Sequence, residues 1–335
     1  MKRKRLTSRE LYEDDSSKVS FKFDQAYGYF LTSKKAEGLR KPTLTSYHEH
    51  FNFFINWLKE SHSEIVNIND LTGQIVRHYI NYLRNDHFNF KTKEYGLSIQ
   101  TTNARLRFLK TFYNFLMNDD LANINPPEQV KFIKEDERIF QPLNELEIQK
   151  LLNVPDIKQY PQFRDKCIMY LLYDTGLRIK EAISLTVNDI DLSGRRIILP
   201  AEKAKGRKSR IIPLAGLVIK MLIELITENE THFESKRLFL NWYGEPMAED
   251  TFRRNLNRYV KKASITKPFT CHDFRRQSIT EMLASGASLF AVQAIVGHSQ
   301  ISTTKKYVHF DEQTIKNQHE LYSPLVKVKR KGNLR

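Results

Sequence analysis

The sequence predicts a mainly α-helical protein of two domains, a helical bundle followed by a mixed α+β domain with a small antiparallel β-sheet. The chain has 335 residues, enough for two domains that each bury a core. Apolar residues recur at three- and four-residue spacing over most of the length, which is the period of an amphipathic helix. Two short runs rich in isoleucine, residues 196–200 (RIILP) and 210–214 (RIIPL), flank a polar loop and predict two paired strands.

Residues 20–122 form the predicted helical bundle, after a charge-dense segment, residues 1–19, that we expect to be a flexible tail. The second helix has a plausible start at Pro42 and Thr43. We expect the aromatic run around Phe53 to form bundle core rather than a platform for stacking bases. The expected helices cover approximately residues 21–30, 44–58, 71–83 and 101–117.

Residues 123–141 contain paired prolines and a run of charges with little to bury, so they predict a linker. The second domain spans residues 142–324 and ends in a basic tail, residues 325–335. Asn144 is placed to cap the first helix of this domain. Further helices are expected at residues 163–173 and 179–185, before the two strands, and from Leu217 onward.

Composition excludes several classes of protein. No stretch approaches 18 consecutive apolar residues, and the N-terminus lacks the apolar segment of a secretory signal, so we expect no membrane association. Cys167 and Cys271 are too few for a disulfide framework, which indicates a reducing, cytoplasmic compartment. The net charge of +15 indicates a polyanionic partner such as nucleic acid.

Four short segments of the second domain carry residues suited to chemistry on a phosphate. Each is common alone, and their ordered combination is what makes the pattern specific. No acidic cluster with metal-ligand spacing accompanies them, so we expect no cofactor and no metal. The segments are residues 175–181 (TGLRIKE), 203–208 (KAKGRK), 272–276 (HDFRR) and 297–307 (GHSQISTTKKY).

In order and spacing, the segments resemble the motifs of the tyrosine recombinase (integrase) family, from about Pro142 to Pro324. The family has an arginine, a hairpin lysine, His-x-x-Arg, and Gly-His with a tyrosine nine residues on. The matching residues are Arg178, Lys205, His272, Arg275, His298 and Tyr307. The resemblance implies the tyrosine recombinase catalytic domain, preceded by a core-binding domain that clamps DNA. It also implies site-specific recombination through a 3′-phosphotyrosine intermediate and a Holliday junction.

The implied roles fit elementary chemistry. Tyr307 is the nucleophile, and because a free phenol has a pKa of about 10, it needs nearby cations and a proton acceptor, His272. Arg178 and Arg275 can each hold two oxygens of a phosphate in a planar fork. Lys205, in the loop between the strands, can protonate the leaving 5′-oxygen.

Two neighbouring polar groups complete this set. His298 would donate a hydrogen bond to a phosphate oxygen, and Glu181 would orient or neutralise Arg178 rather than react. Lys203 or Lys208 could be mistaken for the functional lysine of this loop. Lys205 is favoured for that role because Gly206 follows it and lets the backbone approach DNA.

The sequence departs from the family pattern at Phe274, Arg276 and Val296, none of which changes a catalytic residue type. The segment before the first helix, about 20 residues, is too short for the separate arm-type DNA-binding domain of larger phage integrases.

Alternatives to a tyrosine recombinase are a DNA-binding protein that has lost catalysis, a type IB topoisomerase-like enzyme and an RNA-associated scaffold. The extra length favours integration of a mobile element, while Xer-like resolution of chromosome or plasmid dimers stays open, as does an accessory or directionality factor.

The expected partner is double-stranded DNA, contacted by a helix of the first domain whose polar and basic residues interleave with its apolar face. Those residues are Thr101, Thr102, Arg105, Arg107 and Lys110, and a solvated basic face is the alternative. A helix-like stretch, residues 311–322, follows Tyr307. The resemblance implies that it docks on a neighbouring protomer in a homotetramer on two DNA sites. Packing on its own domain is the alternative.

Overall fold

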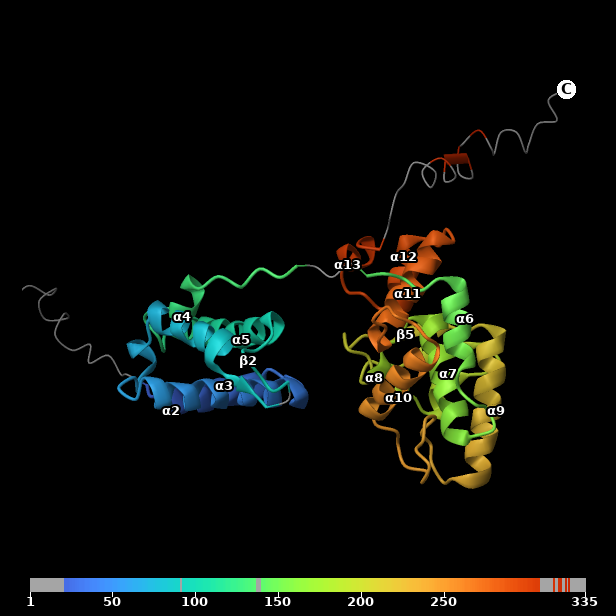
Figure 1. Ribbon diagram of the computed structural model, residues 1–335, viewed down its shortest axis with the longest axis horizontal. Coiled ribbons are helices and arrows are strands. Elements are labelled where there is room, and N and C mark those ends of the chain that lie inside the picture. Colours follow the sequence, from blue (N-terminus) through green and yellow to red (C-terminus); the bar gives the residue numbers. More distant parts are fainter. Residues whose placement is uncertain are drawn as a thin grey trace, which may run out of the picture. The chain divides into compact units, whose positions relative to one another are not determined.

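The protein was analysed as a computed structural model that describes residues 21–90, 92–136 and 140–307, with Lys316, His319, Glu320, Ser323 and Leu325. The chain divides into two compact units, Met1–Arg138 and Ile139–Arg335 (Figure 1). Both are helical with short antiparallel strands, which confirms the predicted fold class. Among the described residues, no helix is long and apolar enough to cross a membrane.

Some predicted segments lie outside the described residues. They are the N-terminal tail, residues 1–19, the C-terminal tail apart from Leu325, and most of the expected helix at residues 311–322.

Unit 1 is a helical bundle around an aromatic core. Phe30, Phe54 and Phe112 are buried, and the rings of Phe30 and Phe112 meet edge to face with centroids 5.3 Å apart. The expected core position of the run around Phe53 is therefore confirmed for Phe54, while Phe53 is partly buried. The elements are α2 (Phe23–Ala36), α3 (Lys41–Ser61), η1 (Ile68–Asp70), α4 (Gly73–Asn81), η2 (Tyr82–Asp86), β1 (Phe88–Asn89), β2 (Glu94–Tyr95), α5 (Ile99–Asn118) and η3 (Pro126–Gln129).

The β1–β2 hairpin of unit 1 was not predicted. Its strands are two residues long and pair antiparallel, with Phe88 opposite Tyr95. A strand of two residues has no alternation of apolar and polar positions for a sequence pattern to detect.

The first part of the stretch predicted as a linker packs on unit 1. Pro126 and Pro127 are buried in η3, and Val130 joins the core. The side chain of Asn103 on α5 donates a hydrogen bond to the Ile133 carbonyl (2.9 Å) and accepts one from the Ile133 amide (3.0 Å). The prolines therefore build a helical turn against the bundle, and the backbone stays bound to unit 1 at least as far as Ile133.

The helices of unit 2 pack on one face of the sheet β3-β4-β5, while Ile198 and Ile211 on its other face are exposed. Figure 1 shows α6, α7 and α9 side by side. Asn144 caps α6 as predicted, because its side chain accepts the Glu147 amide (2.9 Å) while Glu147 accepts the Asn144 amide (2.8 Å). The elements are α6 (Glu145–Asn153), α7 (Tyr160–Thr175), α8 (Ile179–Ile183), η4 (Val187–Asp189), β3 (Ile190–Asp191), β4 (Arg196–Leu199), β5 (Arg210–Pro213), α9 (Gly216–His232), α10 (Glu249–Lys262), α11 (Cys271–Ala284), α12 (Leu289–Val296) and α13 (Ile301–Lys305).

Where the chain enters unit 2, one side chain again binds both backbone groups of a residue, as Asn103 binds those of Ile133 in unit 1. The side-chain oxygen of Gln277 on α11 accepts the Leu143 amide (2.9 Å), and its NH₂ group donates to the Leu143 carbonyl (2.8 Å). Gln277 lies two residues after Arg275, so the entry point of the unit is fixed to the helix that carries the predicted His-x-x-Arg motif.

Candidate active site

Arg178 is placed by a sharp connection between α7 and α8. Gly176 ends α7 in the left-handed conformation (φ 62°), and Arg178 takes the N-cap position of α8. The Arg178 guanidinium donates from Nη1 to Glu181 Oε1 (3.0 Å), and its amide donates to Glu181 Oε2 (3.3 Å). The predicted pairing of these two residues is therefore seen, and it leaves the arginine partly exposed.

Arg275 is buried beside Arg178, and none of the described carboxylates forms an ion pair with it. Its side chain is 2% exposed, and Nη1 donates to the Gly176 carbonyl (2.7 Å). Among the described residues, its buried Nη2 has no hydrogen-bond partner. Burial, followed by the positive charge of Arg178, lowers the pKa of Arg275 to about 9, so the group is still a cation at neutral pH. A buried cation with an unused donor is suited to bind an anion.

The loop between β4 and β5 separates the candidate lysines. Lys203 forms an ion pair with Asp189 and lies 3.4 Å from Thr186 Oγ1, so its ammonium group has a structural role. The Lys205 amide donates to Glu181 Oε1 (3.2 Å), while the residue itself is exposed. Lys208 is exposed as well. The backbone of the loop is thus tied to the site at Lys205 and leaves that side chain on the surface.

The two histidines lie on different elements. His272 is on α11 and exposed, and His298 follows α12 after Gly297. His298 Nδ1 is 2.8 Å from the hydroxyl of buried Thr304. Burial and the charges of Arg275 and Arg178 lower the pKa of His298 to about 4. Partial loss of water, then the charges of Arg276 and Arg275, lower the pKa of His272, so both rings are neutral at pH 7.

Tyr307 follows α13 at the end of the continuous described chain. Its amide donates to the Thr304 carbonyl (3.1 Å), and its ring packs against a small apolar cluster of Ile279, Val292 and Val296. Tyr307 is close enough to Arg275 for a phenolate to interact with the guanidinium. The structure thus gathers residues of all four sequence segments around Arg178 and Arg275.

Arg210 is a charged residue of this site that the sequence did not predict. It opens β5, and its guanidinium donates from Nη2 to Glu181 Oε2 (2.7 Å) and from Nε to the Ile295 carbonyl (3.0 Å). The sequence signal was weak: a basic residue at the start of an apolar strand, directly after the Lys205 loop.

The predicted DNA-binding residues of α5 do not share one exposed face. Thr102 is fully buried, so its expected surface position is wrong. The Arg105 guanidinium stacks on the Phe53 ring at 3.4 Å, with Nε and Nη1 buried, and therefore points into the bundle. The reason is that this helix buries a wider face than its apolar residues alone indicate.

The other three predicted α5 residues lie nearer the surface. Arg107 and Lys110 both contact the ring of Phe132, at 5.4 and 5.0 Å, and Thr101 bonds to Ser98 at the start of the helix.

Comparisons with known proteins agree with this geometry. The model of the phage integrase family matches residues 141–314. Tyrosine recombinase XerC of Bacillus subtilis is 33% identical over 243 residues, 70% of this chain and 79% of the relative. Tyrosine recombinase XerD of Halalkalibacterium halodurans is 29% identical over 300 residues, 88% of this chain and 96% of the relative.

Solved structures show the same fold. The Tn1549 transposon integrase in complex with a circular intermediate DNA superposes with a TM-score of 0.69 at 21% identity, covering 90% of this chain and 100% of that one. A lambda integrase dimer bound to a COC′ core site gives a TM-score of 0.67 at 16% identity, covering 88% and 81%.

The depressed pKa of His298 predicts a pH dependence of stability. In the unfolded chain a histidine binds its proton near pH 6.5, whereas folded His298 does so at about pH 4. The free energy of unfolding should therefore fall as the pH drops from about 6.5 toward 4, and fall less in His298→Asn. In the DNA-free protein, the His298 ring resonance should not titrate above about pH 5, and a midpoint near 6.5 would contradict the described burial.

Proposed function

Because this chain belongs to the phage integrase family and is a site-specific tyrosine recombinase, a DNA strand-transferring enzyme, we propose that it cleaves DNA through Tyr307. The observation that carries the proposal is Arg275, a buried cation whose Nη2 has no partner among the described residues. Arg178 lies close enough to Arg275 to lower the pKa of Arg275 by charge repulsion. A phosphate placed between these arginines removes that repulsion and supplies the missing acceptor.

The proposed reaction is an in-line displacement at phosphorus. The Tyr307 oxygen forms a bond to phosphorus as the bond from phosphorus to the 5′-oxygen breaks, which leaves a 3′-phosphotyrosine. Arg178 and Arg275 neutralise the charge that develops on the non-bridging oxygens. Attack by the freed 5′-hydroxyl of the partner strand reverses the step and yields a Holliday junction.

Each proton has a proposed carrier. His272 is neutral at pH 7, so it can accept the proton of Tyr307. Lys205 donates a proton to the leaving 5′-oxygen, and its position supports this role, because its amide is tied to Glu181 while the residue is exposed. If Thr304 donates to His298 Nδ1, His298 Nε2 carries the hydrogen and can donate it to a phosphate oxygen.

Double-stranded DNA is the proposed substrate, and unit 1 is proposed to clamp it as a core-binding domain. For the biological role we propose integration of a mobile element, and the fold shared with the Tn1549 transposon integrase is compatible with it. The relatives named XerC and XerD support the alternative, resolution of chromosome or plasmid dimers. A cytoplasmic location is part of the proposal.

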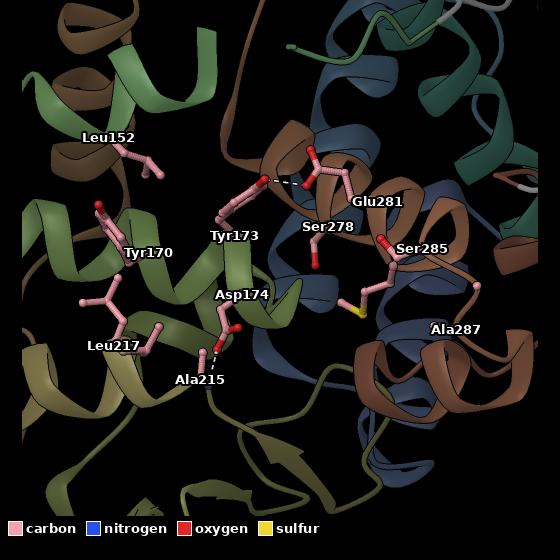
Figure 2. A pocket seen from close by; sticks show the side chains of 13 residues that line it. Leu152, Tyr170, Tyr173, Asp174, Ala215, Leu217, Ser278, Glu281, Ser285 and Ala287 are labelled. Atoms are coloured by element: carbon pink, nitrogen blue, oxygen red, sulfur yellow. Dashed lines mark hydrogen bonds between the residues drawn. The ribbon is translucent and has the colours of Figure 1, made fainter. Parts of the chain in front are cut away.

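Assembly is proposed to use a pocket of unit 2 as the acceptor of the C-terminal segment from a second copy of the chain. The pocket encloses about 650 Å³ between α7, the start of α9 and the end of α11 (Figure 2). Leu217 and Met282 line it, and the hydroxyl of buried Ser278 there has no hydrogen-bond partner among the residues that the structure describes. The segment beyond Tyr307 carries apolar residues at helical spacing, such as Ile315 and Tyr322. Cyclic exchange of such segments closes a homotetramer on two DNA sites.

Tyr307→Phe tests the nucleophile. The variant lacks the attacking oxygen, so covalent protein–DNA adducts on a nicked suicide substrate should vanish while DNA affinity stays within about threefold. Denaturing gel electrophoresis measures the adduct. Tyr243→Phe is the control, because that tyrosine is exposed on a turn elsewhere in unit 2. Adducts that persist in Tyr307→Phe would refute the assignment.

A modified substrate tests Lys205 as the general acid. A 5′-bridging phosphorothioate has a thiolate leaving group that needs no proton, so it should largely restore cleavage by Lys205→Ala. It should not restore Arg275→Ala, which lacks charge neutralisation; removing one such contact costs about two to three decades in rate. Equal rescue of both variants, or rescue of Lys208→Ala in place of Lys205→Ala, would contradict the role.

Truncation tests the exchange of C-terminal segments. Deleting residues from Asp311 onward should leave DNA binding by single protomers intact and abolish synaptic complexes, measured by native gel shift with two labelled sites. Leu217→Arg, which blocks the pocket, should have the same effect. A mixture of the two should restore pairing, because one protomer keeps the segment and the other keeps the pocket. Synapsis by the truncated protein alone would show that the segment is not exchanged.

A further inference from the structure

Glu181 is the common partner of three separate parts of the site. The residue is 1% exposed. Its Oε1 accepts hydrogen bonds from Arg178 Nη1 (3.0 Å) and the Lys205 amide (3.2 Å), and its Oε2 accepts from Arg210 Nη2 (2.7 Å). The start of α8, the loop before β5 and β5 itself therefore meet on one carboxylate.

Arg210 extends this junction to the C-terminal end of α12. Its Nε donates to the Ile295 carbonyl (3.0 Å), one of the last carbonyls of the helix, which lack partners in the helix itself. Gly297 allows this approach, because a Cβ there would lie 3.0 Å from the Cδ, Nε and Cζ atoms of Arg210. Gly297 is also in the left-handed conformation (φ 69°) and directly precedes His298.

We propose that Arg210 is a positioning residue for the recombination reaction. It holds the end of α12, and with it His298, against the carboxylate that holds Arg178 and the Lys205 loop. The inference rests on the proposed roles of those three residues. Arg210 does not need to touch the DNA, because both of its described contacts are inside the protein.

The charge of Arg210 has a second effect, on Glu181. Burial alone would raise the pKa of this carboxyl, and the hydrogen bond and charge of Arg210, the Lys205 amide and the charge of Arg178 together lower it. The charged groups that face it are Arg178 on α8, Arg210 on β5 and, electrostatically, Arg275 on α11. Without Arg210, Glu181 should bind a proton at higher pH and then hold Arg178 less firmly.

The test compares Arg210→Met with Arg210→Lys in the full-length protein. Arg237→Met is the matched control, since Arg237 is a partly buried arginine that also holds a carbonyl, that of Ser184 (2.6 Å). The rate of adduct formation at saturating DNA should fall about 10- to 100-fold in Arg210→Met, the effect of displacing catalytic groups by about 1 Å. The dissociation constant for DNA should change less than about threefold, and Arg237→Met should cleave normally.

The pH profile separates positioning from general loss of structure. The rate of Arg210→Met relative to wild type should fall further as the pH is lowered, because without Arg210 the pKa of Glu181 is higher than in the wild type and the carboxylate is lost at a higher pH. Arg210→Lys keeps the charge beside Glu181 but cannot hold both acceptors, so it should be slower than wild type with an unchanged pH profile. Full activity of Arg210→Lys, or a ratio for Arg210→Met that does not vary with pH, would overturn the inference.

Three further outcomes distinguish a failure of this inference from a failure of the proposed function. If Arg210→Met mainly weakens binding and reduces the salt dependence by about one phosphate contact, Arg210 binds DNA directly and the inference is wrong. If adducts require Tyr307 but Arg210→Met cleaves like wild type, this inference fails while the proposed function stands. Adducts that do not require Tyr307 would instead refute the proposed function.

Discussion

The site depends on one buried negative charge. Glu181 compensates two arginines and binds a loop amide; Arg178 lies three residues before it, whereas Lys205 and Arg210 come from a segment more than 20 residues further along the chain. Removing one member of a buried ion pair typically costs about 3–5 kcal/mol, because the remaining charge loses its compensation. The Glu181 carboxylate therefore stabilises unit 2 at this site and fixes the positions of the Arg178 and Arg210 guanidinium groups.

Glu181 compensates the charges of only some of the arginines of the site. The uncompensated positive charge lies where a substrate phosphate is expected. Arg178 and Arg210 share Glu181, whereas within the described part of the chain Arg275 binds a carbonyl rather than a carboxylate and its Nη2 has no acceptor. A folded protein usually satisfies its buried polar groups, so an exception of this kind is typical of a binding site. In the proposed reaction, the positive charge that destabilises the DNA-free site is the charge that the phosphate of the substrate would neutralise.

The sequence predicted the main helices of both units, the strands β4 and β5 and the ordered motifs, because helical periodicity, the Asn144 cap and short apolar strands are local signals, whereas it missed the two-residue strands β1, β2 and β3. It did not predict Arg210, whose importance comes from a contact with α12, 85 residues further along the chain. It placed Thr102 and Arg105 on the surface, because the inward face of α5 depends on neighbouring helices as well as on its own residues. The paired prolines favoured a free linker, although they pack on unit 1.

The two backbone anchors, Asn103 with Ile133 and Gln277 with Leu143, set the length of the tether between the units. Between them lie residues 134–142, which can span at most about 35 Å when fully extended. If unit 1 clamps DNA as proposed, a tether of this length keeps one unit at an effective concentration in the millimolar range while the other is bound. Two weak contacts would then give a long residence time on one site, because either unit could release and rebind while the other holds the protein there.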